Sequence, residues 1–262
     1  MRPILFEAWG LRAASAPVFA GLAALLAYAY FEFRKKDLGL SEEKFWGLIA
    51  ALAIGVFAGS IGGYALISRG GNWNWALWTG RFAIPGGTFL GALPGAVVMT
   101  ILYCKVMKIP IGPPADVLAG AAPLGLIVMR IGCLLNGCCH GLATGGSWGI
   151  VFTGWCATAP ALRGVPLHPT QLYEAGGALL IFLVVERYAR PRIQAKRMPA
   201  GDAMWISALL YSVLRFVVDF VRAQDPSVVV VLLWPHLSLV QWACAATAAV
   251  CVGRFALGRG RA

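Results

Sequence analysis

Seven long apolar stretches, separated by shorter polar links, account for most of the chain. Each stretch approaches the roughly 20 residues that an α-helix needs to cross a hydrocarbon core of about 30 Å. The pattern therefore predicts an all-α, polytopic membrane protein that forms one integral membrane domain over residues 1–262. The predicted helices are about Ala14–Phe33, Phe45–Ile67, Ala83–Tyr103, Ala115–Leu135, Pro169–Arg187, Ala203–Val221 and Val228–Val252.

The composition agrees with membrane insertion. Hydrophobic residues make up 59% of the chain and charged residues 13%, whereas a soluble domain carries about 25% charged residues. The net charge of +11 comes from basic clusters between the apolar stretches, a placement that suits anionic lipid headgroups and not nucleic acid. Residues Met1–Ala16 lack a short apolar run followed by a small-residue cleavage site, so we expect no removable signal peptide.

Lysine and arginine collect in alternate links, as they do in the cytoplasmic loops of membrane proteins. Fourteen of the 22 basic residues follow the first, third, fifth and seventh predicted helices, six lie on the opposite side, and Arg130 and Arg215 lie within helices. We therefore expect the N-terminus outside and the C-terminus in the cytoplasm. The link of about residues 136–167 is then an extracytoplasmic loop, which is either a folded cap at headgroup level or an inert, flexible connection.

A dense group of polar residues lies at the end of the fourth predicted helix, where Met129–Gly141 reads M-R-I-G-C-L-L-N-G-C-C-H-G. A charge in hydrocarbon costs at least about 2.5 to 3.5 kcal/mol, so Arg130 is expected to face the protein interior and meet a partner there. The alternative is that Arg130 extends to a lipid headgroup while the glycines only allow close helix packing.

The fifth predicted helix begins H-P-T-Q-L-Y-E-A, from His168 to Ala175. Gln171 and Glu174 are three residues apart and so share one helix face, with Glu174 aimed into the membrane as a partner for an arginine.

The sixth predicted helix carries Y-S-V-L-R-F-V-V-D-F-V-R. The spacing places Tyr211, Arg215, Asp219 and Arg222 on one stripe of a helix. Two arginines and one acid leave a surplus positive charge, which is what a phosphate diester requires of its binding site. The alternative is a self-contained ion pair between Arg215 and Asp219 that fixes helix packing.

Glycines stand out in the second and third predicted helices. Gly55, Gly59 and Gly63 follow one another at intervals of one helical turn, which favours close packing of a neighbouring helix. The third helix opens with Pro85-Gly86-Gly87, which favours an irregular or re-entrant start.

Seven cysteines cannot all pair within one chain. Cys104, Cys244 and Cys251 are interpreted as small buried hydrophobes. For the others we prefer a disulfide from Cys156 to Cys138 or Cys139. A thioester-forming nucleophile at Cys138 or Cys139 is a rival interpretation. A metal site built from Cys133, Cys138, Cys139 and His140 is the least favoured, because adjacent cysteines depart from the usual C-x₂-C spacing of metal ligands.

Four motifs together resemble those of the bacterial prolipoprotein diacylglyceryl transferases. They are R-I-G-x-x-x-N-G at Arg130–Gly137 with Gly141, H-P-T-Q-L-Y-E from His168, R-F-V-V-D-F-V-R from Arg215, and L-S-L-V-Q at Leu237–Gln241. The resemblance implies a seven-helix inner-membrane enzyme without a cofactor. It implies transfer of diacylglyceryl from phosphatidylglycerol to a cysteine thiol of an exported prolipoprotein, with release of glycerol phosphate.

The chain departs from the family pattern at several positions. Cys133 and Cys138 stand where the family has asparagine and glutamate, Asp219 stands where glutamate is usual, and Pro85 replaces the histidine of an H-G-G motif that is a leading candidate for the catalytic base. His140 is the substitute base in our interpretation, although an ordinary loop histidine explains it equally well. A different acceptor, or a lipid-binding scaffold without activity, are the alternative functions.

The candidate site follows from the polar positions and from the resemblance together. Arg130, Arg215 and His140 are assigned to catalysis, with no metal. Assigned to substrate binding are Gly86, Gly87, Asn136, Gly137, His168, Gln171, Tyr173, Glu174, Tyr211, Asp219, Arg222 and Gln241.

Overall fold

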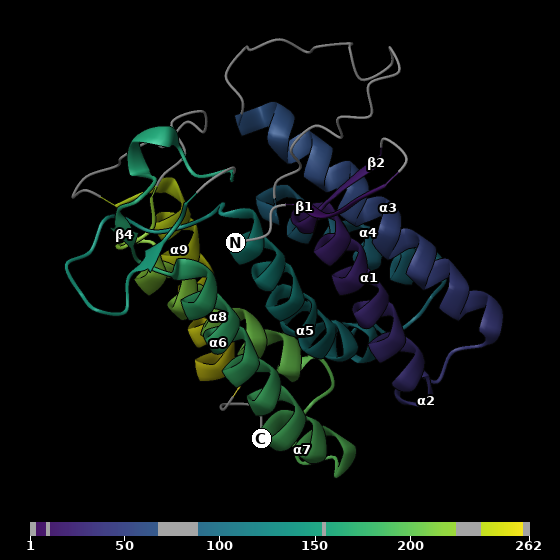
Figure 1. Cartoon of the computed structure of the whole chain (residues 1–262). Coiled ribbons are helices and arrows are strands. Elements are labelled where there is room, and N and C mark those ends of the chain that lie inside the picture. The colour runs from purple at the N-terminus through teal and green to yellow at the C-terminus, as the bar shows by residue number, and fades with distance from the viewer. Residues whose placement is uncertain (1–3, 9–10, 68–88, 154–155, 224–236, 259–262) are drawn as a thin grey trace. The chain divides into compact units, whose positions relative to one another are not determined.

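The computed structural model describes residues 4–8, 11–67, 89–153, 156–223 and 237–258, and these are mostly helical (Figure 1). Four helices in this part of the chain are long and apolar enough to cross a membrane, at Ser15–Phe33, Glu42–Gly63, Gly112–Asn136 and Val240–Leu257. A shorter apolar helix covers Gly91–Val106. The structure is consistent with the expected polytopic membrane protein.

Most of the predicted helices are present with small shifts of their ends. Helices α1 (Ser15–Phe33), α3 (Glu42–Ile67), α5 (Gly112–Asn136) and α8 (Asp202–Val218) match four predicted stretches, and α2 (Lys35–Leu38) is a single turn between the first two. Helix α4 (Phe89–Val106) covers the third stretch from Phe89 onwards. The irregular start predicted at Pro85, Gly86 and Gly87 lies outside the described residues.

The fifth predicted helix ends later than expected. Helix α6 (Thr170–Val184) continues through a π-helical turn, η3 (Val185–Ala189), into α7 (Arg190–Gln194). Glu186 lies in η3 and accepts hydrogen bonds from Tyr30 in α1, from Arg34 directly after α1, and from Arg190 Nε at 2.9 Å. These partly buried contacts compensate charges that the prediction placed at the end of a membrane segment.

Helix α9 (Leu239–Gly258) covers the seventh predicted stretch from Leu239 onwards. The prediction is wrong for Leu237 and Ser238, which precede the helix, and its part before residue 237 lies outside the described residues. The Ser238 Oγ accepts a hydrogen bond from Gln241 N at 3.1 Å, and Gln241 Oε1 accepts one from Ser238 N at 2.9 Å. This reciprocal arrangement is a capping box, which satisfies backbone donors at the first turn of a helix and so fixes where α9 starts.

The chain divides into two compact units, and each is described by itself. Residues 35–114 and 224–231 form one unit, while residues 1–34, 115–223 and 232–262 form the other. In the smaller unit α3 packs on α4 through glycines: a Cβ at Gly59 would lie 2.3 Å from Gly91 O, and one at Gly55 would lie 2.5 Å from Gly95 O. The packing role predicted for Gly55 and Gly59 is confirmed.

The larger unit contains α1, α5 and the helices from α6 to α9, with α6 against α8 and α8 against α9 (Figure 1). Asp116 on α5 accepts hydrogen bonds from Gly201 N at 2.7 Å and Ala203 N at 3.0 Å. These bonds satisfy backbone donors at the start of α8, which has no side-chain cap of its own.

Two short antiparallel sheets depart from the all-α expectation. Strand β1 (Ile4–Ala8) pairs with β2 (Leu11–Ala14), and β3 (Ile150–Val151) pairs with β4 (Pro166–Leu167). The second sheet belongs to the link after α5, which also holds a 3₁₀ turn, η2 (Pro160–Leu162), and a small core of Phe152, Cys156 and Leu167. The link thus has a folded core, whereas its extracytoplasmic position stays a prediction.

Candidate active site

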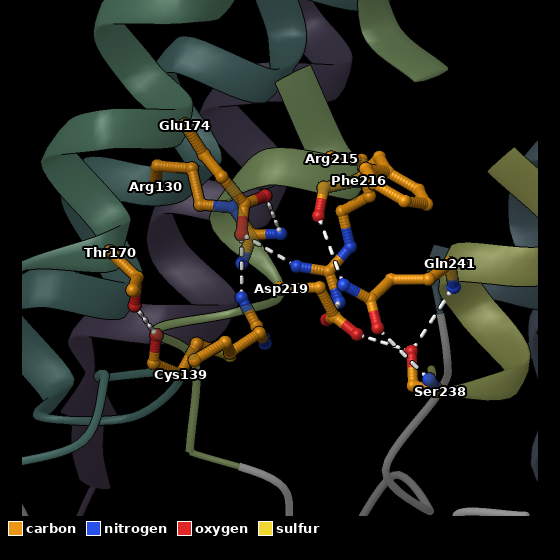
Figure 2. A network of polar contacts seen from close by, with 10 residues as sticks. Arg130, Cys139, Thr170, Glu174, Arg215, Phe216, Asp219, Ser238 and Gln241 are labelled. Atoms are coloured by element: carbon orange, nitrogen blue, oxygen red, sulfur yellow. Dashed lines mark hydrogen bonds and ion pairs between the residues drawn. The ribbon is translucent and has the colours of Figure 1, made fainter. Parts of the chain in front are cut away.

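A fully buried carboxylate, that of Glu174, lies at the centre of the polar residues in the larger unit (Figure 2). Its Oε2 lies 2.6 Å from Arg130 Nη2. Its Oε1 lies 2.5 Å from Arg222 Nη1 and 3.2 Å from Arg215 Nη1. We call Glu174 with these three arginines the arginine cluster. Arg130 and Arg215 thus meet at one carboxylate, and the pairing of Glu174 with an arginine, which the sequence predicted, is confirmed.

Three separate segments bring these side chains together. Arg130 lies near the C-terminal end of α5, Glu174 lies in the second turn of α6, and Arg215 lies in the last turn of α8. The prediction of a single helical stripe is wrong for Arg222, because α8 ends at Val218. Arg222 instead follows a turn and forms a β-bridge with Gly141, where Leu142 N donates to Val221 O at 2.8 Å.

Asp219 extends the arginine cluster towards α9. Arg215 Nη2 lies 2.9 Å from Asp219 Oδ1, so the predicted ion pair exists, but it is not self-contained because Arg215 also contacts Glu174. Asp219 accepts a hydrogen bond from Ser238, and Gln241 Nε2 donates to Phe216 O at 3.2 Å (Figure 2). The capping box of α9 thus anchors the end of α8.

The charges of this network do not cancel. Three guanidinium groups meet the carboxylates of Glu174 and Asp219, which leaves one net positive charge. In the described part of the chain, Arg130 Nε and Gln171 Oε1 are buried polar atoms without a hydrogen-bond partner. Burying a charged or polar group without a partner is costly, so the site is suited to an anion that accepts and donates hydrogen bonds.

Side-chain hydrogen bonds fix the turn that follows α5. Gly137, at φ +74°, ends the helix, with hydrogen bonds from Gly137 N to Leu134 O at 3.2 Å and from Cys138 N to Cys133 O at 3.1 Å. Three successive carbonyls of this turn then accept side-chain hydrogen bonds, namely Gly137 O from Thr158 at 2.7 Å, Cys138 O from Gln171 at 2.7 Å and Cys139 O from Thr170 at 2.6 Å.

The contacts in and around this turn give several candidate site residues a structural role. Gly137 supplies the left-handed backbone conformation, Gln171 Nε2 holds a carbonyl, and Asn136 O accepts a hydrogen bond from Ala157 N at 2.9 Å. Tyr211 interacts electrostatically with Glu174 and Arg215. Gly86 and Gly87 lie outside the described residues.

The two candidate histidines, His140 and His168, are close in sequence to members of the arginine cluster, but their side chains contact other groups. His140 Nδ1 is 3.0 Å from Gly141 O, and the ring lies 5.9 Å from that of Phe152. His168 Nδ1 is 3.3 Å from the Tyr173 hydroxyl, and the two rings meet edge to face. Among the described residues, no hydrogen bond or ion pair joins either imidazole to the three arginines.

The expected disulfide is wrong. All seven cysteines are free thiols, and Cys156 is buried against Phe152 and Leu167. The Sγ atoms of Cys133, Cys138 and Cys139 instead lie within 4.8 Å of one another, and we call these three residues the thiol cluster. Hydrogen bonds to the neighbouring thiols lower the pKa of Cys139 below its usual value, and the positive charges of Arg222 and Arg130 lower it further.

Sequence reasoning missed Thr170 and Thr158, whose hydroxyls hold the turn, and the role of Ser238. Ser238-x-x-Gln241 is the sequence signature of a capping box, so this signal was present in the motif from Leu237 to Gln241. No comparable local signal exists for Thr158, which contacts Gly137 across 21 residues.

Long apolar helices and a buried, net-positive polar site between α5, α6 and α8 define a polytopic membrane protein with a candidate site for an anion. The family model of the prolipoprotein diacylglyceryl transferases matches residues 3–257. The chain belongs to this family.

Curated relatives carry the same family name. A phosphatidylglycerol–prolipoprotein diacylglyceryl transferase of Geobacter sulfurreducens is 33% identical over 219 residues, which cover 78% of this chain and 77% of that protein. One of Idiomarina loihiensis is 31% identical over 251 residues, which cover 92% and 86%. One of Clostridium tetani is 28% identical over 228 residues, which cover 86% and 87%.

Proposed function

We propose that this chain transfers diacylglyceryl from phosphatidylglycerol to a cysteine thiol of an exported prolipoprotein. The observation that carries the proposal is the arginine cluster, in which residues from three family-like motifs meet at one buried carboxylate and leave one net positive charge. The relatives named above are transferases acting on these two substrates. A lipid phosphate diester carries the single negative charge that the site lacks.

The reaction is a displacement at a glyceryl carbon. The acceptor thiol loses its proton, its sulfur attacks the carbon that bears the phosphate ester oxygen, and the carbon–oxygen bond breaks. The products are a diacylglyceryl thioether and glycerol phosphate, which leaves with the bonding electron pair. Since the leaving group gains negative charge in the transition state, Arg130, Arg215 and Arg222 stabilise it electrostatically.

Glu174 and Asp219 act as positioning residues in this proposal. Arg130 and Arg222 each present one nitrogen to Glu174, and Arg215 divides its two terminal nitrogens between Glu174 and Asp219. The planar guanidinium has five N–H donors, so each arginine retains donors for a phosphate while its position is held. Asn136 and Gln171 are proposed as neutral groups that orient the headgroup.

His140 is proposed as the base that removes the thiol proton. A carbonyl oxygen can only accept a hydrogen bond, so the contact between His140 Nδ1 and Gly141 O places the proton of the neutral ring on Nδ1. The other ring nitrogen, Nε2, is then the proton acceptor. His168, Tyr173 and Tyr211 are proposed to contact the substrates. Gly86 and Gly87, which lie outside the described residues, are assigned to substrate binding from the family resemblance.

The arrangement in the membrane is also proposed. Seven helices cross the bilayer of a bacterial inner membrane, with the N-terminus outside and the C-terminus in the cytoplasm. The distribution of basic residues supports this orientation. It puts the arginine cluster and the link of about residues 136–167 at the extracytoplasmic side, where exported prolipoproteins arrive.

The test is an assay of the purified protein with labelled phosphatidylglycerol and a peptide that contains a lipobox cysteine. Mass analysis of both products is expected to show the thioether peptide and glycerol phosphate in equal amounts. Arg192→Ala is the matched control, because Arg192 is exposed on α7, where its guanidinium contacts Tyr188 through the backbone oxygen and the ring. Bound lipid without turnover would instead identify a lipid-binding scaffold, and an acylated protein thiol would identify a thioester carrier.

A further inference from the structure

The thiol cluster has no part in the proposed transfer, although it lies directly beside the arginine cluster. Cys133 lies in the last turn of α5, and Cys138 and Cys139 follow the end of that helix. The chain folds back at Gly137, so the three Sγ atoms come within 4.8 Å of one another. Three thiols gathered in this way form a potential set of soft ligands.

The backbone around the thiol cluster holds the sulfur atoms in place. Cys139 has φ +61°, a left-handed conformation that non-glycine residues adopt rarely and at an energetic cost. The hydrogen bonds from Gln171 to Cys138 O and from Thr170 to Cys139 O fix both residues at the start of α6 (Figure 2 shows the second). Such preorganisation is characteristic of a functional site whose ligands must not move apart.

We propose that Cys133, Cys138 and Cys139 bind one soft, thiophilic metal ion, Cu(I), in a three-coordinate site. Metal–sulfur bonds of about 2.3 Å give sulfur–sulfur separations of roughly 4 Å in a trigonal site. The present separations of up to 4.8 Å therefore need only a small contraction. Each thiol gives up its proton to the solvent as the metal binds, so no other reactant is required.

The coordination number favours Cu(I) over other thiophilic ions. Structural Zn²⁺ and iron–sulfur sites use four protein ligands. In the described part of the chain, the group of candidate ligands contains these three cysteines and does not include His140. Cu(I) accepts three thiolates without a fourth ligand. Arg130 Nη1, 3.9 Å from Cys133 Sγ, offsets part of the negative charge of such a complex.

The test uses the full chain, purified in detergent, reduced and freed of reductant, and equilibrated with Cu(I) and a chromophoric Cu(I) chelator as competitor. We expect one copper per chain, and X-ray absorption with sulfur neighbours only. Cys139→Ala and Cys138→Ala are expected to abolish retention against the chelator. Cys244→Ala is the matched control, since Cys244 is a half-buried thiol of α9 outside the thiol cluster, and it is expected to retain copper fully.

A graded variant tests the preorganisation. Thr170→Val removes the hydroxyl that holds Cys139 O but leaves all three thiols. Affinity for Cu(I) is expected to fall by roughly 10-fold, as for other outer groups that orient metal ligands. An unchanged affinity would contradict the role of Thr170 in the site.

A measurement on the unaltered protein guards against variants that fail to fold. The native protein is treated briefly with one alkylating reagent, then denatured and treated with a second that marks the thiols left unmodified. We expect Cu(I) to protect Cys133, Cys138 and Cys139, but not Cys244, from the first reagent. Equal protection of Cys244, copper retained by Cys139→Ala, or a preference for Zn²⁺ would overturn the proposal. None of these measurements involves phospholipid, so the result is independent of the proposed transferase activity.

Discussion

Arg222 and Glu174 form an ion pair of 2.5 Å although Arg222 lies four residues beyond the last residue of α8. Arg222 is held there by the pairing of its segment with residues 140–142, where Ala223 N donates to His140 O at 3.2 Å. Glu174 consequently contacts three arginines that approach it from α5, from α8 and from the turn after α8. The carboxylate is shared, so its loss affects all three.

The first prediction concerns the charge of Glu174. Glu174→Gln keeps the size of the side chain but leaves three clustered arginines with Asp219 as their one carboxylate partner in the site. The free energy of unfolding is expected to fall by about 3–5 kcal/mol, the usual effect of removing one partner from a buried ion pair. Thermal unfolding in detergent measures this. In Glu42→Gln, an exposed partner of Lys35, the change should stay below about 1 kcal/mol. Equal unfolding midpoints for the two variants would contradict the argument.

The second prediction concerns Arg130 and Arg215. Arg130→Ala and Arg215→Ala are each expected to abolish transfer to the lipobox peptide while the protein still inserts, because each removes a phosphate contact. Arg→Lys at the same positions should restore little activity, since an ammonium group cannot reproduce bidentate phosphate contacts. Arg192→Ala should be fully active. Turnover at the unaltered rate in either alanine variant would rule out the proposed phosphate site.

The third prediction concerns the start of α9. Ser238→Ala removes the capping hydroxyl and the hydrogen bond to Asp219. Stability is expected to fall by about 1 kcal/mol or more for the lost cap, and turnover should fall as well because Asp219 no longer holds Arg215 firmly. Thr247→Ala is the control: the exposed Thr247 hydroxyl bonds Ala243 O within the same helix, and a change within about 0.5 kcal/mol is expected. Equal stability and equal turnover of the two variants would show that the capping box does not support the site.

The fourth prediction concerns the contact of α3 with α4. A Cβ at Gly59 would lie 2.3 Å from Gly91 O, whereas one at Gly62 has no atom within 4 Å. Gly59→Ala is therefore expected to destabilise the protein by about 1–3 kcal/mol through overpacking. Gly62→Ala should be neutral or stabilising by up to about 1 kcal/mol because alanine favours helix. Thermal inactivation of the pair gives a direct comparison, and the opposite order would refute the packing.

The fifth prediction concerns topology and rests on the unequal distribution of basic residues. A reporter that functions only in the cytoplasm should be active when it is fused after Ala262. A reporter that functions only outside the cytoplasm should be active when it is inserted near Thr158. The reverse pattern would remove the proposed extracytoplasmic site as well.

The convergence of charges could be predicted from the sequence because the hydrocarbon environment constrains it. Arg130, Glu174 and Arg215 lie in apolar helices, and a charge there must find an opposite charge in the protein. Hydrophobic length likewise located α1, α3 and α5 to within a few residues. Both inferences rest on strong local signals.

The features that sequence reasoning missed depend on where the chain leaves the helix. A helical spacing rule placed Arg222 on α8, but the helix ends at Val218, and a turn carries Arg222 to the same carboxylate. The grouping of Cys133, Cys138 and Cys139 was considered from the sequence but least favoured because of its spacing, and it is the reversal at Gly137 that brings the three thiols together. The disulfide prediction failed because Cys156 is used in the core of the link.

The sharing of Glu174 also bears on how the chain is made. Arg130 is synthesised first and its counter-charge, Glu174, follows on the next long helix, α6, so these two charges can enter the bilayer as an ion pair. Helix α8 arrives later with Arg215 already paired to Asp219 four residues on, and so brings its own neutralising acid. The one surplus cation, Arg222, is delivered last and outside the helix, where its charge need not enter hydrocarbon before the earlier helices have assembled. The order of charges along the chain therefore supplies Arg130 and Arg215 with counter-charges that are synthesised after them, which limits how long either arginine is unpaired in the bilayer.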